Sequence, residues 1–125
     1  MTVEQAIQQV RDRKPNQYTD AQMIGWLSEC DSSIFSALVE THELPEGMPE
    51  EFHGYTEDNE ETELIARPPF DVLYGYYLES RIDLYNKETN NFNNTITLYN
   101  NAYAAYAAWY DKNHMPRSYA THFRL

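Results

Sequence analysis

The chain has 125 residues and a formal net charge of −11, and 42% of its residues are hydrophobic, eleven of them tyrosine. One domain, residues 1–125, is the default for this length, and so acidic a chain is a poor ligand for nucleic acid because phosphate affinity comes largely from Lys and Arg. The single cysteine, Cys30, excludes an intramolecular disulfide framework and a cysteine-based zinc site and fits a reducing compartment. Residues 1–20 contain no apolar run like that of a signal peptide, and no stretch has the length of a membrane helix, so we expect no membrane partner.

The first expected helix covers residues 3–13. Thr2 and Gln5 have the spacing of a capping box, in which each side chain satisfies a free backbone N–H at the helix end. Pro15 then stops the helix. The apolar residues that follow the cap recur on one face, which should lie in the core: Val3, Ala6, Ile7 and Val10.

The second expected helix covers residues 20–41 and repeats the start signal with Thr19 and Gln22. Its core-facing stripe consists of Met23, Ile24, Leu27, Cys30, Ile34, Phe35, Leu38 and Val39. Cys30 lies within this stripe, so we expect a buried, inert thiol rather than a nucleophile. Gly25 costs about 1 kcal/mol of helix stability relative to Ala, and close packing against another helix is one reason for a glycine there.

A long loop over residues 42–68 follows. Residues 40–63 hold ten of the twenty acidic residues and neither Lys nor Arg. Such a run is typical of a solvated loop; the alternative is a docking surface for a basic partner, or a repulsive surface facing DNA, in which Glu57, Glu60 and Glu61 are the candidate contact residues. Residues 62–66 are expected to form a short strand or an extended piece lying on the helices.

The chain is expected to be helical again from about residue 70 to residue 113. Bulky residues recur there at spacings of four and three over more than four heptads. This seam consists of Leu78, Ile82, Tyr85, Thr89, Phe92, Ile96, Tyr99, Tyr103, Tyr106 and Tyr110. Because the pattern keeps its phase through residues 86–91, one long or kinked helix is favoured; two helices, over about 70–88 and 89–113 with a tight turn near Asn90, are the alternative.

Tyrosine dominates the C-terminal half of the seam. Its ring gives a large contact area and tolerates a wet edge, which suits a surface that packs on a partner as well as on its own domain. The candidate interaction residues are Tyr99, Tyr103, Tyr106 and Tyr110. The alternative is a core that happens to use tyrosine, and in both cases we expect the first three rings to be at least partly buried.

The C-terminal tail, residues 114–125, contains Arg117 and Arg124 and no acidic residue. Its charge is opposite to that of the loop, and surfaces of opposite charge steer association. We therefore expect the tail or the loop to take part in an intermolecular contact; the alternative is that neither touches a partner.

Motifs for catalysis are missing from the sequence. There is no Gly-rich phosphate loop and no Gly-x-Ser-x-Gly elbow. The four histidines are scattered, and none has a helical partner suited to metal binding: His42, His53, His114 and His122. The acids of residues 57–63 lack the alternation and the glycine of a calcium loop. We therefore expect a protein that is not an enzyme and has no catalytic residues, no cofactor and no metal.

Two segments, residues 61–88 and 99–116, carry a family resemblance. They contain Glu63-Leu64, Pro69 to Tyr74, Tyr77 to Glu79, Ile82-Asp83, Asn86 to Glu88, Trp109-Tyr110 and His114 to Pro116, and "THELPE" at residues 41–46 adds to the pattern. These features resemble a family of small proteins encoded near the portal and capsid genes of long-tailed phages and prophages. Members of that family are similar to head–tail connector proteins, the head-completion or neck adaptors.

The resemblance implies a helical adaptor that forms a ring under the portal, joins it to the tail and has no catalytic residues. Its partners would be further copies of itself and portal or tail proteins, with no direct nucleic-acid binding and no membrane. Its location would be the virion or the cytoplasm of the bacterial host. We therefore expect an all-α fold: a helical bundle with a long acidic loop between an N-terminal helix pair and a C-terminal helix that is continuous, kinked or split. A phage assembly factor or chaperone-like adaptor is the alternative function, and a small enzyme or regulator a third.

Overall fold

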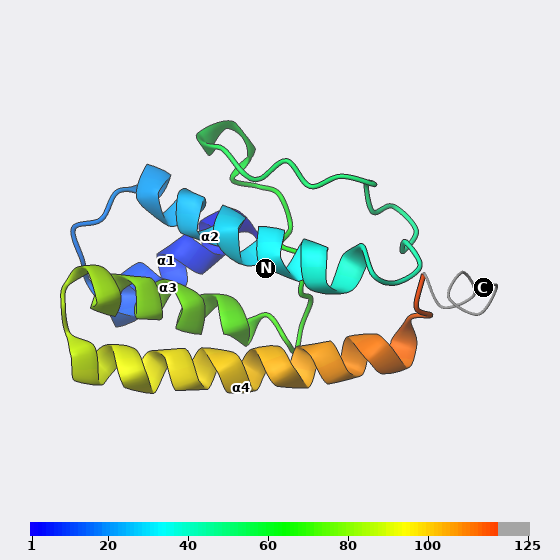
Figure 1. Cartoon of the computed structure of the whole chain (residues 1–125). Coiled ribbons are helices and arrows are strands. Elements are labelled where there is room, and N and C mark those ends of the chain that lie inside the picture. Colours follow the sequence, from blue (N-terminus) through cyan, green and yellow to red (C-terminus); the bar gives the residue numbers. More distant parts are fainter. Residues whose placement is uncertain (118–125) are drawn as a thin grey trace.

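The computed structural model describes residues 1–117, and this part of the chain folds into four α-helices without a β-strand (Figure 1). The helices are α1 (Val3–Arg13), α2 (Asp20–Ile34), α3 (Val72–Tyr85) and α4 (Thr89–Asn113). Two short helical segments complete the set: η1 (Phe35–Val39), a π-helical continuation of α2, and η2 (Glu57–Asn59), a 3-10 turn in the loop. The all-α class expected from the sequence is confirmed.

Both N-terminal helices begin at the predicted capping boxes. The backbone N–H of Gln5 donates to Thr2 Oγ1 at 3.2 Å, and the Gln5 side chain accepts from the Thr2 N–H at 2.9 Å. Thr19 and Gln22 form the same pair of bonds at the start of α2. All apolar residues predicted for the two core-facing stripes are buried.

The end of the second helix differs from the expected span of 20–41. The α-helical part stops at Ile34, and the last turn widens to a π-helix in which the Glu40 N–H donates to Phe35 O at 2.9 Å. Beyond it, the Thr41 hydroxyl donates to Ala37 O at 2.8 Å and closes the helix end. The boundary is set by this side-chain bond, because a threonine hydroxyl that binds the preceding turn competes with further helical bonds.

The favoured prediction of a single long or kinked helix through residues 86–91 is wrong. The chain turns at residues 86–88, where Lys87 adopts a left-handed backbone (φ 61°), and α4 runs back along α3 (Figure 1). The seam residues of α4 pack on α3 at residues outside the seam, as Tyr99 does on Tyr77 and Phe92 on Arg81, so the continuous heptad phase does not mark a continuous helix. Tyr85, at the turn, is 59% exposed and leaves the seam.

Figure 1 shows α4 at the edge of the molecule, beside α3, with α1 and α2 on the other side of α3. Helix α4 packs mainly on α3 and touches η1 near its own C-terminal end. The core lies where α1, α2 and α3 meet, and its largest fully buried side chains include Met23, Leu27, Ile34, Leu64, Leu73, Tyr74, Leu78 and Ile82.

The acidic loop is tied to the start of α1 by backbone hydrogen bonds. The N–H groups of Val3 and Glu4 donate to the carbonyl oxygens of Thr62 (3.1 Å) and Glu60 (2.9 Å). These are first-turn donors that a helix cannot satisfy internally. Residues 62–66 form no strand: a single β-bridge joins Glu63 to Thr2, and the backbone bends at residues 62, 65 and 66. Leu64 and Ala66 are fully buried.

Candidate functional site

The seam tyrosines follow one face of α4, and the two nearest its C-terminal end are the most buried. The Tyr99 hydroxyl lies 3.6 Å from Cys30 Sγ, and its ring packs edge-on against Tyr77 at 5.1 Å. Tyr103 stacks on Tyr99 and is partly buried, whereas Tyr106 and Tyr110 are only 2% and 3% exposed. The predicted burial of the first three is confirmed, and it occurs against the chain's own helices.

Burial also governs the ionisable groups of this face. Desolvation raises the pKa of the Cys30 thiol far above its ordinary value, with a further rise from the neighbouring Asp31 carboxyl. The same cause raises the pKa of the Tyr99 and Tyr106 hydroxyls, and that of Tyr77 to about 12. Cys30 is therefore a protonated packing residue in the folded chain, as its place in the apolar stripe predicts.

An aromatic cluster surrounds the C-terminal end of the seam: Phe70, Tyr106, Trp109, Tyr110 and His114. The Phe70 ring lies 5.5 Å from Tyr106 and 5.3 Å from Trp109, and His114 stacks on Tyr110 at 3.8 Å. Trp109 is 42% exposed although it sits between buried rings. The heptad pattern does not indicate Phe70, Trp109 or His114 as contact residues, since the first lies far away in the chain and the others fall off the seam.

This cluster forms one wall of a groove under the acidic loop. A cavity of about 240 Å³ lies between the cluster and the loop, and a larger one of about 610 Å³ continues beneath residues 46–55. The two cavities share four lining residues: Glu46, Met48, Ile65 and Arg67. We call the combined cavity the loop groove.

The loop groove is mostly apolar with a predominantly acidic rim. Glu46, Glu51 and Glu63 line it, against the single guanidinium of Arg67, whose Nη1 lies 3.4 Å from Glu63 Oε2. Glu63 also accepts from the amino group of Met1 at 2.9 Å, and this bond is the main cause that lowers the pKa of its carboxyl. The rim favours a partner segment that carries positive charge.

One buried polar group in the groove wall has no bonding partner. The Tyr110 hydroxyl is buried and forms no hydrogen bond with any residue that the structure describes. Desolvation raises the pKa of this hydroxyl. An unsatisfied buried hydroxyl costs stability, and a small rearrangement that brought a water or a partner group to it would recover that cost.

The side of the groove formed by residues 65–67 is held by Asp31, a fully buried carboxyl on α2. Its oxygens accept from the hydroxyls of Tyr55 (2.5 Å) and Tyr74 (2.6 Å) and from the Ile65 N–H (3.1 Å). The Tyr74 hydroxyl in turn accepts from the Ala66 N–H at 2.7 Å. The bonds of Tyr55, Ile65 and Ala66 tie the loop to the core, and the Tyr74–Asp31 bond joins α3 to α2. Asp31 therefore positions the groove and has no open face for chemistry.

The other end of the groove is fixed by His42. Its Nε2 lies 2.8 Å from Asp111 Oδ1 on α4, and its Nδ1 donates to the Leu38 carbonyl at 2.6 Å. Beside it the Glu43 N–H donates to Met115 O at 2.7 Å, and the Arg117 N–H to Thr41 O at 2.8 Å. These bonds join the end of α4 to the end of the second helix.

The predicted charged residues are not brought together within the chain. Glu57 and Glu61 are exposed, and Glu60 is half-buried where its carbonyl caps α1. Arg117 is exposed at the end of α4, and within residues 1–117 no ion pair joins it to these acids. Arg124 lies outside the described residues.

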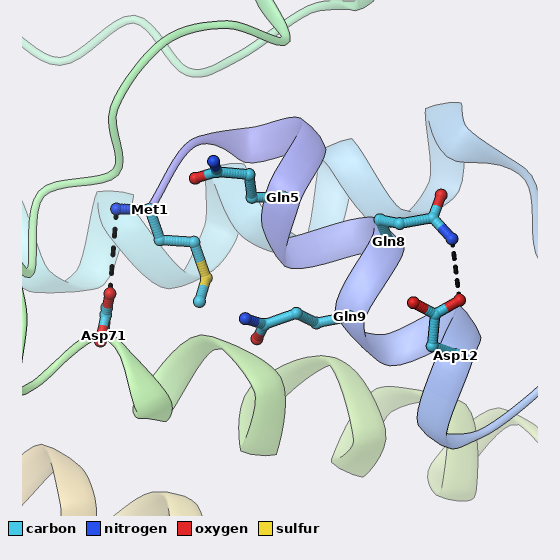
Figure 2. Close-up of a pocket in the computed structure, with 6 residues that line it drawn as sticks. All are labelled: Met1, Gln5, Gln8, Gln9, Asp12 and Asp71. Carbon is cyan, nitrogen blue, oxygen red and sulfur yellow. Dashed lines mark hydrogen bonds and ion pairs between the residues drawn. The ribbon is translucent and has the colours of Figure 1, made fainter.

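A separate concavity of about 420 Å³ lies between α1 and the start of α3 (Figure 2). Gln8 donates to Asp12 at 2.9 Å at one end, and the Met1 amino group lies 3.8 Å from Asp71 at the other. Its two carboxyls therefore sit at opposite ends and do not form the paired acids that hydrolytic chemistry uses.

Among residues 1–117 no group of three or more His, Cys, Asp or Glu side chains could hold a metal ion. In that range no helix combines the length and the apolar character needed to cross a membrane.

Comparisons with protein-family models, with curated proteins and with solved structures found no match for this chain.

Proposed function

We propose that the protein is a structural component of a phage virion, a head–tail connector or neck adaptor that acts by self-association and by docking to portal or tail proteins. The motif resemblance of residues 61–88 and 99–116 supplies the phage assignment. The observation that carries the mode of action is the loop groove, because it combines an apolar floor, a half-exposed tryptophan and an acidic rim. Such a surface suits protein docking.

Trp109 is the expected anchor of the docked segment. Its ring is already held by Phe70 and Tyr106, so little side-chain entropy is lost when a partner covers its exposed part. Aromatic residues in such settings carry a large share of binding energy in protein interfaces. The partner segment in this proposal is extended, apolar and positively charged, to match the acidic rim.

In this proposal the acidic loop and the basic tail steer the association with partner proteins. Residues 40–63 would steer a basic surface of the portal or tail protein, and Arg117 with Arg124 would steer an acidic one. Both act on the rate of encounter and on register more than on affinity. The proposal includes no catalytic step and no contact with nucleic acid.

The alternative is an assembly factor or chaperone-like adaptor from the same gene cluster. It would use the same groove but bind one partner transiently. Electron microscopy of the complex distinguishes the two: a connector gives ring-shaped particles, whereas a chaperone-like adaptor gives a small complex with a single partner.

The test is co-purification with the portal and tail proteins encoded beside this gene, in wild type and in Trp109→Ala. We expect the substitution to weaken capture at least about tenfold, the usual effect of losing an interface anchor. Tyr85→Ala is the control, because Tyr85 is an exposed aromatic residue at the end of α3, beside the turn into α4 and far along α4 from Trp109, and it should leave capture unchanged. Equal capture by wild type and Trp109→Ala would reject the loop groove as the docking site.

A further inference from the structure

Helix α4 has an uncharged segment that is unusual for this chain. None of the 22 residues from Thr89 to Tyr110 is charged, whereas no other run between charged residues exceeds eight residues. Solvent-facing helix surfaces in soluble proteins usually carry charges of both signs. The absence of charge over these 22 residues is therefore a property of α4, because 23% of the residues of the whole chain are charged.

The uncharged residues form a second face, opposite to the tyrosine seam. Positions 90, 94, 97, 101, 104 and 108 repeat at spacings of four and three, each two positions before a seam residue and so about 200° around the helix. Every member is exposed. We call these six residues, together with the exposed neighbours Leu98 and Ala105, the outer face of α4: Asn90, Asn94, Thr97, Leu98, Asn101, Ala104, Ala105 and Ala108.

The position of α4 leaves this face open. Figure 1 places α4 at the edge of the molecule with α3 along one side, and α4 packs mainly on α3. Leu98, near the middle of the face, is 46% exposed. Asparagine is a poor helix former, so these residues weaken an exposed helix that glutamate or lysine would strengthen.

Charge identifies the partner that fits this face. Two copies of the chain, each with a net charge of −11, repel each other over most orientations. The outer face of α4 brings no charge to the contact, so repulsion and desolvation cost are least there. Asparagine amides both donate and accept, so a face rich in them is complementary to a second copy of itself.

We infer that the outer face of α4 is a self-association surface on which α4 of a second copy packs about a two-fold axis. Leu98 supplies the apolar centre of this contact, and Ala104, Ala105 and Ala108 let the two helix backbones approach closely. Asn94 and Asn101 bond across it. A two-fold contact of this kind is closed and gives a dimer rather than a filament.

The dimer is expected to be weak. Helix α4 has 25 residues and is thus about 37 Å long, and one face of one helix buries less than the roughly 1,200 Å² of a standard interface. We expect a dissociation constant on the order of 10–100 µM. The inference goes beyond the proposed function, because a closed two-fold pair is a separate contact from the head-to-tail contacts that would build a ring.

The test compares wild type with Asn101→Glu and Ala105→Glu by sedimentation equilibrium at protein concentrations up to about 1 mM. Glutamate is as good a helix former as alanine and better than asparagine, so neither change should unfold α4, which circular dichroism checks. Wild type should rise from its monomer mass of 14.7 kDa toward twice that value. Each variant should dimerise at least about tenfold more weakly, because a buried unpaired charge is costly.

Gln9→Glu on α1 is the control, since it adds the same charge at an exposed helical position away from α4. It should change the dissociation constant less than about twofold. Added salt should strengthen wild-type dimerisation because it screens the repulsion between two acidic copies. A contact between the acidic loop and the basic tail would instead weaken with salt.

Two results would overturn the inference: a wild type that stays monomeric up to 1 mM, or glutamate variants that associate as well as wild type. If wild type dimerises but the glutamate variants do so too, self-association stands and only the surface is wrong. Capture of portal or tail proteins through Trp109 is measured separately, so the docking function can fail or survive independently.

Discussion

At the scale of single residues, Asp31 shows how a polar group can organise an apolar core. It lies next to Cys30 in the buried stripe of α2, and its carboxyl gathers bonds from the loop at Tyr55 and Ile65 and from α3 at Tyr74. A lone carboxyl in a core-facing stripe is the sequence signal that could have revealed this network. Replacing it by alanine should destabilise the fold by about 3 kcal/mol, because the donors it leaves are buried.

The Asp31 carboxyl also makes stability depend on pH. Burial raises its pKa above the ordinary 3.8, and the bonds from Tyr55, Tyr74 and Ile65 offset part of the rise. A carboxyl whose pKa is raised by folding binds its proton more tightly in the folded chain, so its contribution to stability grows as pH falls through the folded-state pKa toward 3.8. We therefore expect the unfolding free energy of wild type to improve relative to Asp31→Asn as the pH falls from 7 to about 4.

Urea unfolding of both proteins at the two pH values measures the difference between their unfolding free energies. The other titrating groups are the same in both proteins, so their effects cancel in this difference. A difference that shrinks as pH falls would mean that the three donors outweigh burial and that the pKa is lowered.

Gly25 corrects one expectation about packing. A close neighbouring helix was one reason for glycine there, but Gly25 is exposed and a Cβ added to it would meet no atom within 4 Å. Gly25→Ala should therefore stabilise the protein by about 0.5–1 kcal/mol through helix propensity alone. Gly54→Ala is the contrasting control and should destabilise, because Gly54 has φ +82°, a backbone conformation that a residue with a Cβ disfavours. Thermal melts of the two variants should shift in opposite directions.

At the scale of elements, helix starts and core-facing stripes could be predicted from the sequence, whereas the packing of one element on another could not. Capping boxes and apolar stripes depend on residues three or four positions apart, so α1 and the start of α2 follow from the sequence. The turn at Lys87 does not, because the heptad phase continues across it and either a straight helix or a hairpin buries the seam. The loop groove joins residues near 46, 66 and 110, whose proximity arises only from tertiary packing.

The seam tyrosines should differ in their contribution to the α3–α4 hairpin. Tyr106 is almost fully buried between Phe70 and Tyr110, whereas Tyr103 is only partly buried. Tyr106→Ala should cost about 3–5 kcal/mol, the range for removing a buried aromatic ring. Tyr103→Ala should cost less than half as much, since part of its ring already meets solvent.

Denaturant midpoints of the two variants, read by far-ultraviolet circular dichroism, provide the comparison. Equal losses would indicate that Tyr103 is covered in solution, as contact with a second copy or a partner would require.

At the scale of the whole molecule, the charge distribution separates three surfaces. The acidic loop over residues 40–63, the basic tail from residue 114 and the uncharged outer face of α4 each suit a different kind of contact. Salt should therefore act on them in opposite directions: screening weakens docking steered by loop or tail, and strengthens association through α4.

The tail can be tested without disturbing the fold. The Arg117 backbone N–H donates a hydrogen bond to Thr41 O, so a deletion that includes residue 117 would remove this bond. The double substitution Arg117→Gln and Arg124→Gln removes only the two charges. If the tail steers docking, we expect the double variant to associate with its portal or tail partner about tenfold more slowly at low salt and at nearly the wild-type rate at 0.5 M salt. Dissociation should change little, because steering acts before close contact forms. Stopped-flow mixing at several salt concentrations measures both rates, and a double variant with the wild-type salt dependence would remove the tail from the docking surface and leave the loop groove as the remaining candidate.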